Sequence, residues 1–319
     1  MKKKFLTLAL VLMVAVTLFA AKPVEVSGTF DFGYRITFNP LGSALADNSK
    51  YSTFVSVSSD YWKVNLTAGG GVFANNVKNA MTADIYLSKA LAAEGVDMGD
   101  LDVTLHAGTG VGKSAPSVFA DKAEFGAYKA AAGNANAGAT VKYGALVEVY
   151  GAADLTAKND FVFGAKTTPV EGVSAALGYA TAGKVFAASA AADIKKLANL
   201  DFDLAASVAY QGDFTAKTNK MYTSVYGSYS DIGLWVQYGT DTKWHRLAAK
   251  ASYSTTIEGF GLAAGVKVAS ADLTADPLKV DVTLDGSAAY TLGGVKYKLA
   301  LEYVVNGAFT LTPSASFSF

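Results

Sequence analysis

The 319-residue sequence has no cysteine, two histidines and six prolines. Because cysteine is absent, the folded chain cannot rely on disulfide bonds and must be stabilised by a well-paired fold. The sequence also lacks a Cys/His cluster with the spacing of a zinc site, a glycine-rich phosphate loop and an EF-hand string. We therefore expect neither a metal nor another cofactor.

Charge is also scarce. Charged residues make up 17% of the chain and hydrophobic residues 51%, and 27 Lys and Arg balance 27 Asp and Glu. A nucleic-acid-binding protein carries a basic stripe or patch. A chain this close to neutral argues against that class, so we expect no nucleic acid among its partners.

The first twenty residues have the pattern of a secretory signal peptide. Lys2, Lys3 and Lys4 precede an uncharged, mostly apolar run over 5–19, and Ala20 and Ala21 supply a cleavage site. An N-terminal membrane anchor is the alternative, but the run is shorter than the roughly 20 residues of a spanning helix. We expect removal of residues 1–20, which leaves 21–319 as one domain with a formal charge of 24 − 27 = −3.

Beyond residue 21, polarity alternates with a period of two, as in strands with one apolar face. No apolar run there approaches the length of a membrane helix, which excludes a helical inner-membrane protein. The alternation is clearest near the C-terminus, where Leu278, Val280, Val282 and Leu284 interleave with Lys279, Asp281, Thr283 and Asp285. No stretch shows a sustained helical period.

This alternation predicts eighteen strands, near 24–38, 51–57, 61–69, 80–90, 100–109, 122–131, 139–150, 160–167, 173–180, 183–192, 200–210, 220–229, 231–239, 244–254, 258–270, 278–291, 295–305 and 308–319. Sixteen is the alternative, because the segments over 160–192 have the weakest pattern. A soluble β-sandwich would also alternate. Uniform strands and small residues on the polar faces, such as Gly261, Ala263 and Gly265, favour a transmembrane antiparallel up-and-down β-barrel. A barrel of 16–18 strands encloses an aqueous channel.

Connections on the two sides of this barrel should differ in length. Tight turns are expected at 58–60, 169–172, 230–231, 258–259 and 293–294, and longer polar connections at 39–50, 70–79, 110–121, 211–219 and 271–277. The stretch 132–138 and the Asn306-Gly307 turn depart from this rule. Glu-Gly pairs at 94–95, 171–172 and 258–259 predict a repeated turn. Pro313 lies inside the last strand, where we expect a bulge or an unpaired position.

The last strand carries a family resemblance. Apolar side chains occupy alternate positions up to a terminal aromatic residue: Phe309, Leu311, Pro313, Ala315, Phe317 and Phe319. This resembles the closing strand of bacterial outer-membrane proteins of the general porin type, in which the barrel assembly machinery reads that pattern. The assembly signal would then be Phe309, Leu311, Phe317 and Phe319.

The resemblance implies a location in the bacterial outer membrane, contact with its lipid, and a porin function. Small hydrophilic solutes and ions would diffuse passively through the barrel. Rows of Ala and Val on the outer wall would support a homotrimer, as in general porins. The alternative is a surface-exposed barrel that acts as an adhesin, antigen or envelope anchor without conductance, although short outer loops argue against it. A barrel for hydrophobic substrates would need a plug domain, and none is recognisable.

In a porin the polar faces of the strands line the lumen. The seventeen candidate pore-lining residues are Glu25, Asp31, Arg35, Lys63, Lys142, Glu148, Asp201, Asp203, Arg246, Lys250, Lys267, Lys279, Asp281, Asp285, Lys296, Lys298 and Glu302. Nine are basic and eight are acidic. Because rings of one sign select ions, this mixture predicts weak ion selectivity.

Two further features bear on function. The connection 110–121 occupies the slot where general porins fold a loop into the barrel, but it is short for that role, and we expect a surface loop. Aromatic residues near strand ends predict girdles at the two membrane interfaces. They are Tyr34, Tyr51, Trp62, Tyr179, Tyr210, Tyr238, Tyr253, Tyr290 and Tyr303.

The sequence offers few candidate catalytic residues. His106 falls on a polar face with no nucleophile beside it in sequence, and His245 lies next to Trp244 at a strand start. Barrel hydrolases use serine–histidine or aspartate–histidine pairs. We expect both histidines to be solvated or interfacial, and the chain not to be an enzyme.

Overall fold

The computed structural model describes residues 24–33, 35–38, 50–70, 78–109, 115–119, 129–131, 135–156, 160–241 and 244–319. The expected signal peptide lies outside these residues. Within the described part of the chain, no helix is both long enough and apolar enough to cross a membrane.

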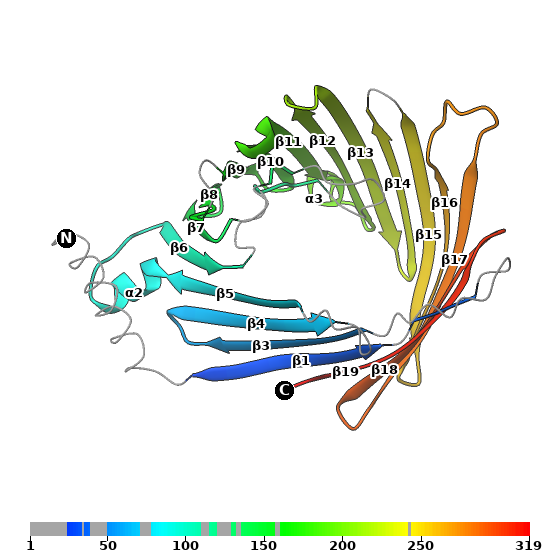
Figure 1. Cartoon of the computed structure of the whole chain (residues 1–319), viewed down its shortest axis with the longest axis horizontal. Coiled ribbons are helices and arrows are strands. Elements are labelled where there is room, and N and C mark those ends of the chain that lie inside the picture. Colours follow the sequence, from blue (N-terminus) through cyan, green and yellow to red (C-terminus); the bar gives the residue numbers. More distant parts are fainter. Residues whose placement is uncertain are drawn as a thin grey trace.

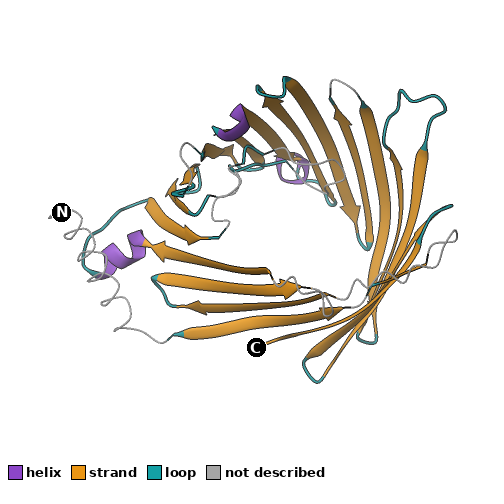
Figure 2. Cartoon of the chain, viewed as in Figure 1, coloured by secondary structure: helices purple, strands orange, loops and turns teal. Residues whose placement is uncertain are grey.

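The strands form one closed antiparallel barrel (Figure 1). Their bounds are β1 (Glu25–Gly33), β2 (Ile36–Phe38), β3 (Lys50–Ser58), β4 (Trp62–Gly70), β5 (Lys78–Tyr86), β6 (Leu101–Gly108), β7 (Ala137–Tyr143), β8 (Val147–Ala153), β9 (Phe161–Val170), β10 (Val173–Ala180), β11 (Val185–Asp193), β12 (Asp203–Asp213), β13 (Thr218–Tyr229), β14 (Ile232–Thr240), β15 (His245–Ile257), β16 (Phe260–Ser270), β17 (Val280–Leu292), β18 (Val295–Val304) and β19 (Phe309–Ser318). In the described residues three short helical pieces lie between strands: α2 (Leu87–Ala93), η1 (Ala182–Lys184) and α3 (Ile194–Ala198) (Figure 2).

β1 and β2 are two parts of one strand, so the barrel has eighteen strands. Both pair with β19 in the same register, with Gly33 opposite Ser314 and Ile36 opposite Leu311. Between them Arg35 belongs to no strand, and this interruption faces the stretch of β19 around Pro313. Proline has no N–H to donate to a neighbouring strand. The predicted unpaired position is therefore confirmed on this side only, because on the other side Pro313 lies opposite Leu299 of β18.

The first and last strands close the barrel. Beyond the β1–β19 ladder, Gly28 N–H donates to the Phe319 carbonyl oxygen at 2.8 Å and Phe319 N–H donates back at 3.0 Å. The Phe319 ring covers Gly28 so closely that a Cβ there would lie 2.6 Å from its Cζ. The missing side chain at position 28 therefore makes room for the C-terminal aromatic ring at the seam.

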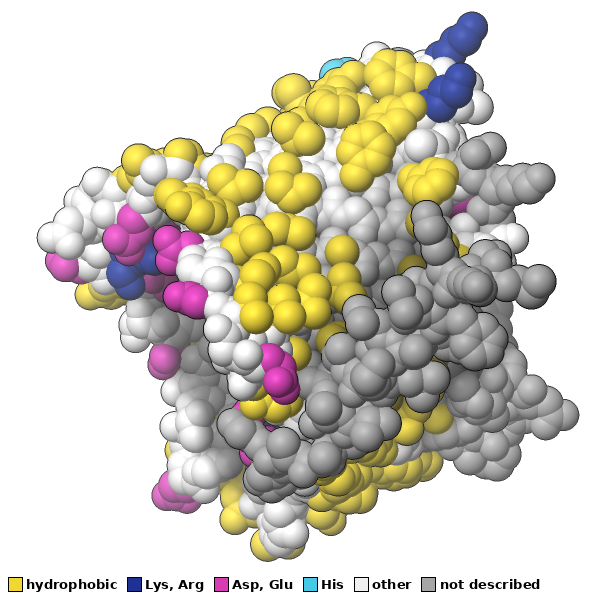
Figure 3. Space-filling view, turned by 90° about the vertical axis from the view of Figure 1, so that its left-hand side faces the viewer, with side chains coloured by type: hydrophobic (Ala, Val, Ile, Leu, Met, Phe, Trp, Pro, Cys, Tyr) yellow, Lys and Arg dark blue, Asp and Glu magenta, His cyan; other side chains and the backbone are white. Residues whose placement is uncertain are grey.

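The ladder registers keep one set of side chains on each face of the wall. On the outer face, Val266 lies opposite Leu284, and Leu284 lies opposite Tyr303. Val266 and Leu284 are 46% and 42% exposed. Figure 3 shows hydrophobic side chains spread over the part of the outer wall that it presents, with acidic side chains gathered toward one edge. The alternation in the sequence therefore corresponds to an apolar exterior.

The strand count agrees with the sequence prediction, but two of the predicted strands are wrong. The segment expected at 139–150 is a hairpin, because the turn 144–146 separates β7 from β8. The segment expected at 122–131 is not a strand in its described part, 129–131. Near 80–90 the strand ends at Tyr86 and α2 follows it. The connection from β6 to β7 consequently extends from 109 to 136. The stretch 132–138, predicted as an unusually long connection on the turn side, is instead the end of this connection and the start of β7.

The tight turns predicted on one side are confirmed, but the long connection predicted at 211–219 is wrong, because β12 extends to Asp213 and β13 begins at Thr218. The long connections predicted at 39–50 and 70–79 lie almost entirely outside the described residues. The turns at 171–172, 230–231, 258–259 and 293–294 join strands at one rim, which also holds the start of β1, the end of β19, α2 and α3. Gly95, Gly172 and Gly259 have φ of 83°, 84° and 83°. Such φ values favour glycine, so the repeated Glu-Gly pairs mark turns, as predicted. The Asn306-Gly307 turn lies at the opposite rim.

Candidate functional site

The inner face of the barrel is the candidate site. A pocket of about 540 Å³ is lined mainly by residues of this face of β15 to β19, together with Arg35. By register, the same face carries fourteen of the candidate residues: Glu25, Asp31, Lys63, Lys142, Glu148, Asp203, Arg246, Lys250, Lys267, Asp281, Asp285, Lys296, Lys298 and Glu302. Asp201 and Lys279 lie just before β12 and β17, which begin at Asp203 and Val280, so no strand ladder places their side chains and their pore-lining role stays a prediction.

Charged side chains form a row across one sector of this face. Lys250 forms an ion pair and hydrogen bond with Asp285, and Arg35 Nη2 lies 3.9 Å from Glu302 Oε1. Asp285 and Glu302 are directly opposite each other on β17 and β18. We call the inner face of β15–β19 with Arg35 the open sector.

A second charged row crosses the wall near the turn-bearing rim. Asp102, Lys142, Glu148 and Lys166 are successive register partners on β6 to β9, so their signs alternate. Lys142 Nζ and Glu148 Oε2 are 3.9 Å apart. The sequence analysis missed Asp102 and Lys166, although the position of Lys166 relative to the outward Phe161 and Phe163 would have placed it on the polar face.

Asp203 is held at the same rim. It accepts hydrogen bonds from Lys195 Nζ at 2.7 Å and from Ser228 Oγ at 2.8 Å. Lys195 lies on α3, outside the strands, and its hydrogen bond to Asp203 raises the pKa of the ammonium group. Both partners are exposed, so we assign this pair a local ordering role.

Part of the long β6–β7 connection folds against the inner wall. Val118 N–H donates to Ser189 Oγ at 3.0 Å, and the Ser117 and Ser189 hydroxyl oxygens are 3.3 Å apart. The rings of Phe119 and Tyr222 are 6.3 Å apart, and Phe119 is 6% exposed. The expectation of a surface loop at 110–121 is therefore wrong for its described part, 115–119. The false strand at 122–131 had made this connection seem too short to reach inside.

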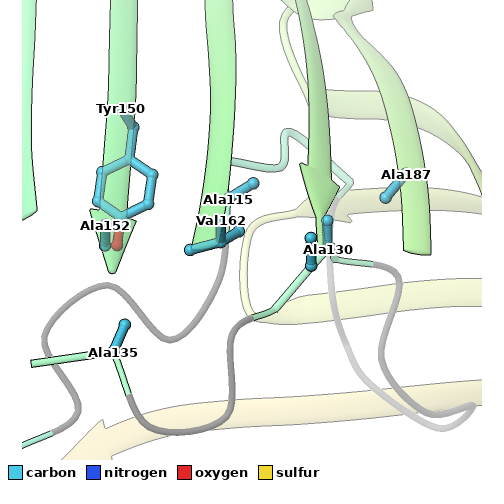
Figure 4. Close-up of a cluster of buried hydrophobic side chains, with 8 residues drawn as sticks. Ala115, Ala130, Ala135, Tyr150, Ala152, Val162 and Ala187 are labelled. Atoms are coloured by element: carbon cyan, nitrogen blue, oxygen red, sulfur yellow. The ribbon is translucent and has the colours of Figure 1, made fainter. Parts of the chain in front are cut away.

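Small side chains on the wall receive this inner segment, which we define as 115–119 together with 129–131. Ala115 N–H donates to the Ala130 carbonyl oxygen at 2.7 Å, and both side chains are buried among inner residues such as Val162 (Figure 4). A Cβ at Gly178 would overlap Ala115, and one at Gly164 would lie 2.9 Å from the Ala115 Cβ. The two glycines therefore form the seat of the segment. We call the inner face of β8–β14 the covered sector.

His106 has a hydroxyl neighbour that the sequence did not reveal. Its Nδ1 lies 2.7 Å from Asp84 Oδ1 and its Nε2 lies 2.8 Å from Thr140 Oγ1. This order of carboxylate, imidazole and hydroxyl is that of hydrolase triads. However, β6 and β7 are paired on both sides at these residues, so the nearby backbone N–H groups belong to the ladder and are not free to form an oxyanion hole. The described residues also contain no group of three or more acidic or histidine side chains able to hold a metal ion.

Outward aromatic side chains lie near both ends of the strands. Toward the turn-bearing rim, the Phe260 and Tyr290 rings stack with centroids 4.5 Å apart. Toward the other rim, Phe163 pairs with Tyr179 at 5.5 Å and Phe186 with Tyr210 at 6.4 Å. Of the nine predicted girdle residues, Tyr179, Tyr210, Tyr238, Tyr253, Tyr290 and Tyr303 share the outer face. Trp62, opposite Ile85, has the outer-face register as well but is only 7% exposed, and Tyr34 and the Tyr51 side chain lie outside the described residues.

The fold is shared with solved structures. OpdL of Pseudomonas aeruginosa matches with a TM-score of 0.61 at 8% identity, over 93% of this chain and 98% of that chain. OccAB3 of Acinetobacter baumannii matches with a TM-score of 0.61 at 8% identity, over 93% and 99%. OpdQ of Pseudomonas aeruginosa matches with a TM-score of 0.61 at 11% identity, over 94% and 99%. No protein-family model and no curated protein matches the sequence.

Proposed function

We propose that the chain is an outer-membrane porin through which small hydrophilic solutes and ions diffuse passively. The observation that carries this proposal is the polarity of the closed wall, which is apolar and exposed outside and charged inside. In a membrane barrel the outer face meets lipid and the inner face meets water. The matched structures are outer-membrane porins, which supports the same function.

The candidate residues on the inner face, with Arg35, would line the channel. The inner segment would narrow it, since Ser117 to Phe119 occupy space against β11 and β13. Acidic and basic side chains lie side by side in both charged rows, so the field of each is partly cancelled by its neighbour. Weak ion selectivity follows.

Export and assembly would use the two ends of the chain. Residues 1–20 would act as the signal peptide, and Phe309, Leu311, Phe317 and Phe319 would be read by the barrel assembly machinery. The packing of Phe319 on Gly28 gives the terminal ring a second, structural role at the seam. Outer-membrane insertion of Phe319→Ala in cells, compared with its refolding in detergent, separates the two roles.

A homotrimer would form through the outer wall of β7 and β8. These strands have 7 residues each, fewer than the roughly 9–11 that cross a bilayer at about 45°. Their outward side chains include Ala137, Ala139 and Ala153, which allow close approach of another wall. Because the chain has no cysteine, Ala139→Cys should cross-link between copies, whereas Ala288→Cys on the outer face of β17 should not.

Diffusion through the channel needs no catalysis, and we propose no enzymatic activity. We also find nothing in the described residues that favours the surface-anchor alternative.

Single-channel recording of the refolded protein in a planar lipid bilayer tests the porin proposal. We expect discrete current steps that grow with salt concentration, and a small reversal potential in a salt gradient. Protein that is folded and inserted but conducts no current would overturn the channel and favour the surface-exposed barrel.

A further inference from the structure

The pocket in the open sector has an ordered arrangement of charge. Across the wall the side chains run Lys250, Asp285, Glu302 and Arg35, which gives the order basic, acidic, acidic, basic. The two carboxylates are direct cross-strand partners, and partners of like charge repel each other. A cation placed between them would relieve this repulsion.

The two ion pairs in this row differ in tightness. Lys250 is hydrogen-bonded to Asp285, and their side chains are 28% and 31% exposed. Arg35 and Glu302 are 3.9 Å apart, beyond hydrogen-bonding distance, and are 48% and 51% exposed. Arg35 and Glu302 are therefore open to a solute that offers a carboxylate to one and an ammonium group to the other.

The wall leaves space for such a solute. Ser252, Ala263 and Ala300 are small, and the pocket volume of about 540 Å³ is within the range of ligand sites, roughly 300–1,000 Å³. Gly265 lies under the Lys250–Asp285 pair, and a Cβ there would overlap Asp285 and lie 2.7 Å from Lys250 Cε. Because Gly265 has no side chain, Lys250 on β15 can reach Asp285 on β17 across the intervening strand β16. The ion pair in turn holds Asp285 beside Glu302.

We infer that this pocket binds small zwitterionic solutes with a free ammonium and a free carboxylate group, such as α-amino acids. The ammonium group lies between Glu302 and Asp285, and the carboxylate accepts hydrogen bonds from the Arg35 guanidinium, which suits planar carboxylates. This inference rests on the proposed channel function, because the solute reaches the pocket through the lumen. It assigns a solute preference to a channel with weak ion selectivity.

The test compares L-alanine with its two singly charged analogues, propionate and ethylammonium. Each is titrated against the KCl current of the refolded protein in a planar bilayer, and each is also examined by saturation-transfer NMR on protein in detergent. We expect alanine to reduce the current at a concentration about fivefold below that of either analogue, since one exposed ion pair contributes about that factor.

Matched variants locate the effect. Glu302→Gln should abolish the preference for alanine, whereas Glu148→Gln, which opens the Lys142–Glu148 pair of the same 3.9 Å separation, should retain it. Gly265→Ala changes no charge but displaces the Lys250–Asp285 pair, and it should weaken alanine binding as well. Each response is normalised to the KCl conductance of the same variant.

The outcomes separate the two proposals. Conductance with equal responses to alanine and its analogues overturns the zwitterion site and leaves the channel. Alanine-selective NMR transfer without conductance supports the site and overturns the channel. Loss of the preference in both Glu302→Gln and Glu148→Gln also overturns the assignment, because the effect then follows the overall charge of the lumen.

Discussion

The two sectors of the inner wall have the same ladder geometry but differ in what lies against them. In the covered sector the inward side chains include Val162, Ala187 and Tyr222, which are 1%, 5% and 1% exposed. In the open sector they include Arg35 and Glu302, whose side chains are 48% and 51% exposed. The difference follows the inner segment, which packs on the first sector and reaches the second only at one end, where the cluster around Phe119 includes Ala248 of β15 and Ala269 of β16.

This contrast shows that the inside of a barrel is not one environment. Where the chain covers its own wall, inward positions are buried between two layers of protein and favour small or aromatic side chains. Where the wall faces water, the same positions hold charges and hydroxyl groups, because a buried unpaired charge would be costly. The outer face of the wall is apolar behind both sectors, so a charge introduced on it should destabilise the barrel equally behind each.

The largest expected effect comes from a charge on the outer face. Leu284→Arg, on the outer face behind the open sector, and Leu177→Arg, on the outer face behind the covered sector, should each destabilise the inserted barrel by about 2–4 kcal/mol, as for Arg at the bilayer midplane. Val282→Arg, nearer a strand end, should cost less. Asp281→Arg, on the inner face, should be tolerated. Urea unfolding from lipid vesicles measures all four, and a much smaller cost for Leu177→Arg would show that the covered wall does not face lipid.

The covered sector also explains where the sequence prediction was weakest. The segments over 160–192 had little alternation, and Gly164, Ala176, Gly178 and Ala187 occupy their inward positions. Because both faces carry apolar residues there, polar and apolar residues no longer alternate clearly along these strands, although the strands are as well paired as the others. The open sector kept the alternation, and its strands β15 to β19 lie close to their predicted ranges.

The hidden hairpin at β7–β8 has a different physical cause. After a two-residue turn the outward residues switch from odd to even numbers or the reverse, as from Tyr229 to Ile232. This switch in the sequence pattern reveals a strand boundary. After the three-residue turn 144–146 the outward residues keep odd numbers, because outward Tyr143 pairs with outward Val147. The alternation therefore continues through this turn, with Leu146 as the one exception among the polar positions 142–148 that carry a side chain. α2 and α3, with 7 and 5 residues, are too short to establish a helical period.

The placement of the inner segment and the contacts of His106 were beyond the sequence for another reason. The alternation of polar and apolar residues assigns each residue to the inner or outer face. It does not say which residues meet across strands or what lies against them. The Val118–Ser189 contact joins positions 71 residues apart, and the His106–Thr140 contact joins positions 34 apart. Such contacts depend on the closed register of the whole barrel.

A smaller effect, about 1–3 kcal/mol for overpacking, is expected when the seat of the inner segment is filled. Gly178→Val should displace Ala115 and the inner segment, and the channel conductance should rise because the lumen widens. Gly261→Val is the matched control in the open sector, where the nearest atom to a Cβ is the Ala289 carbonyl oxygen at 3.9 Å. Its conductance should stay close to that of the wild type. Equal conductance of a folded Gly178→Val and the wild type would show that the segment does not narrow the channel.

The smallest effect should come from Ser189→Ala, which removes the acceptor of the Val118 N–H while leaving the wall geometry intact. A hydrogen bond of this kind contributes about 0.5–1.5 kcal/mol, so hydrogen exchange at the Val118 amide should become roughly 2- to 12-fold faster. Ser287→Ala, on the uncovered wall of the open sector, should leave that amide unchanged. If Val118 exchanges at the wild-type rate in both variants, the Ser189 hydroxyl does not hold the segment. Its position then depends on the glycine seat and on the packing of Phe119 against Tyr222.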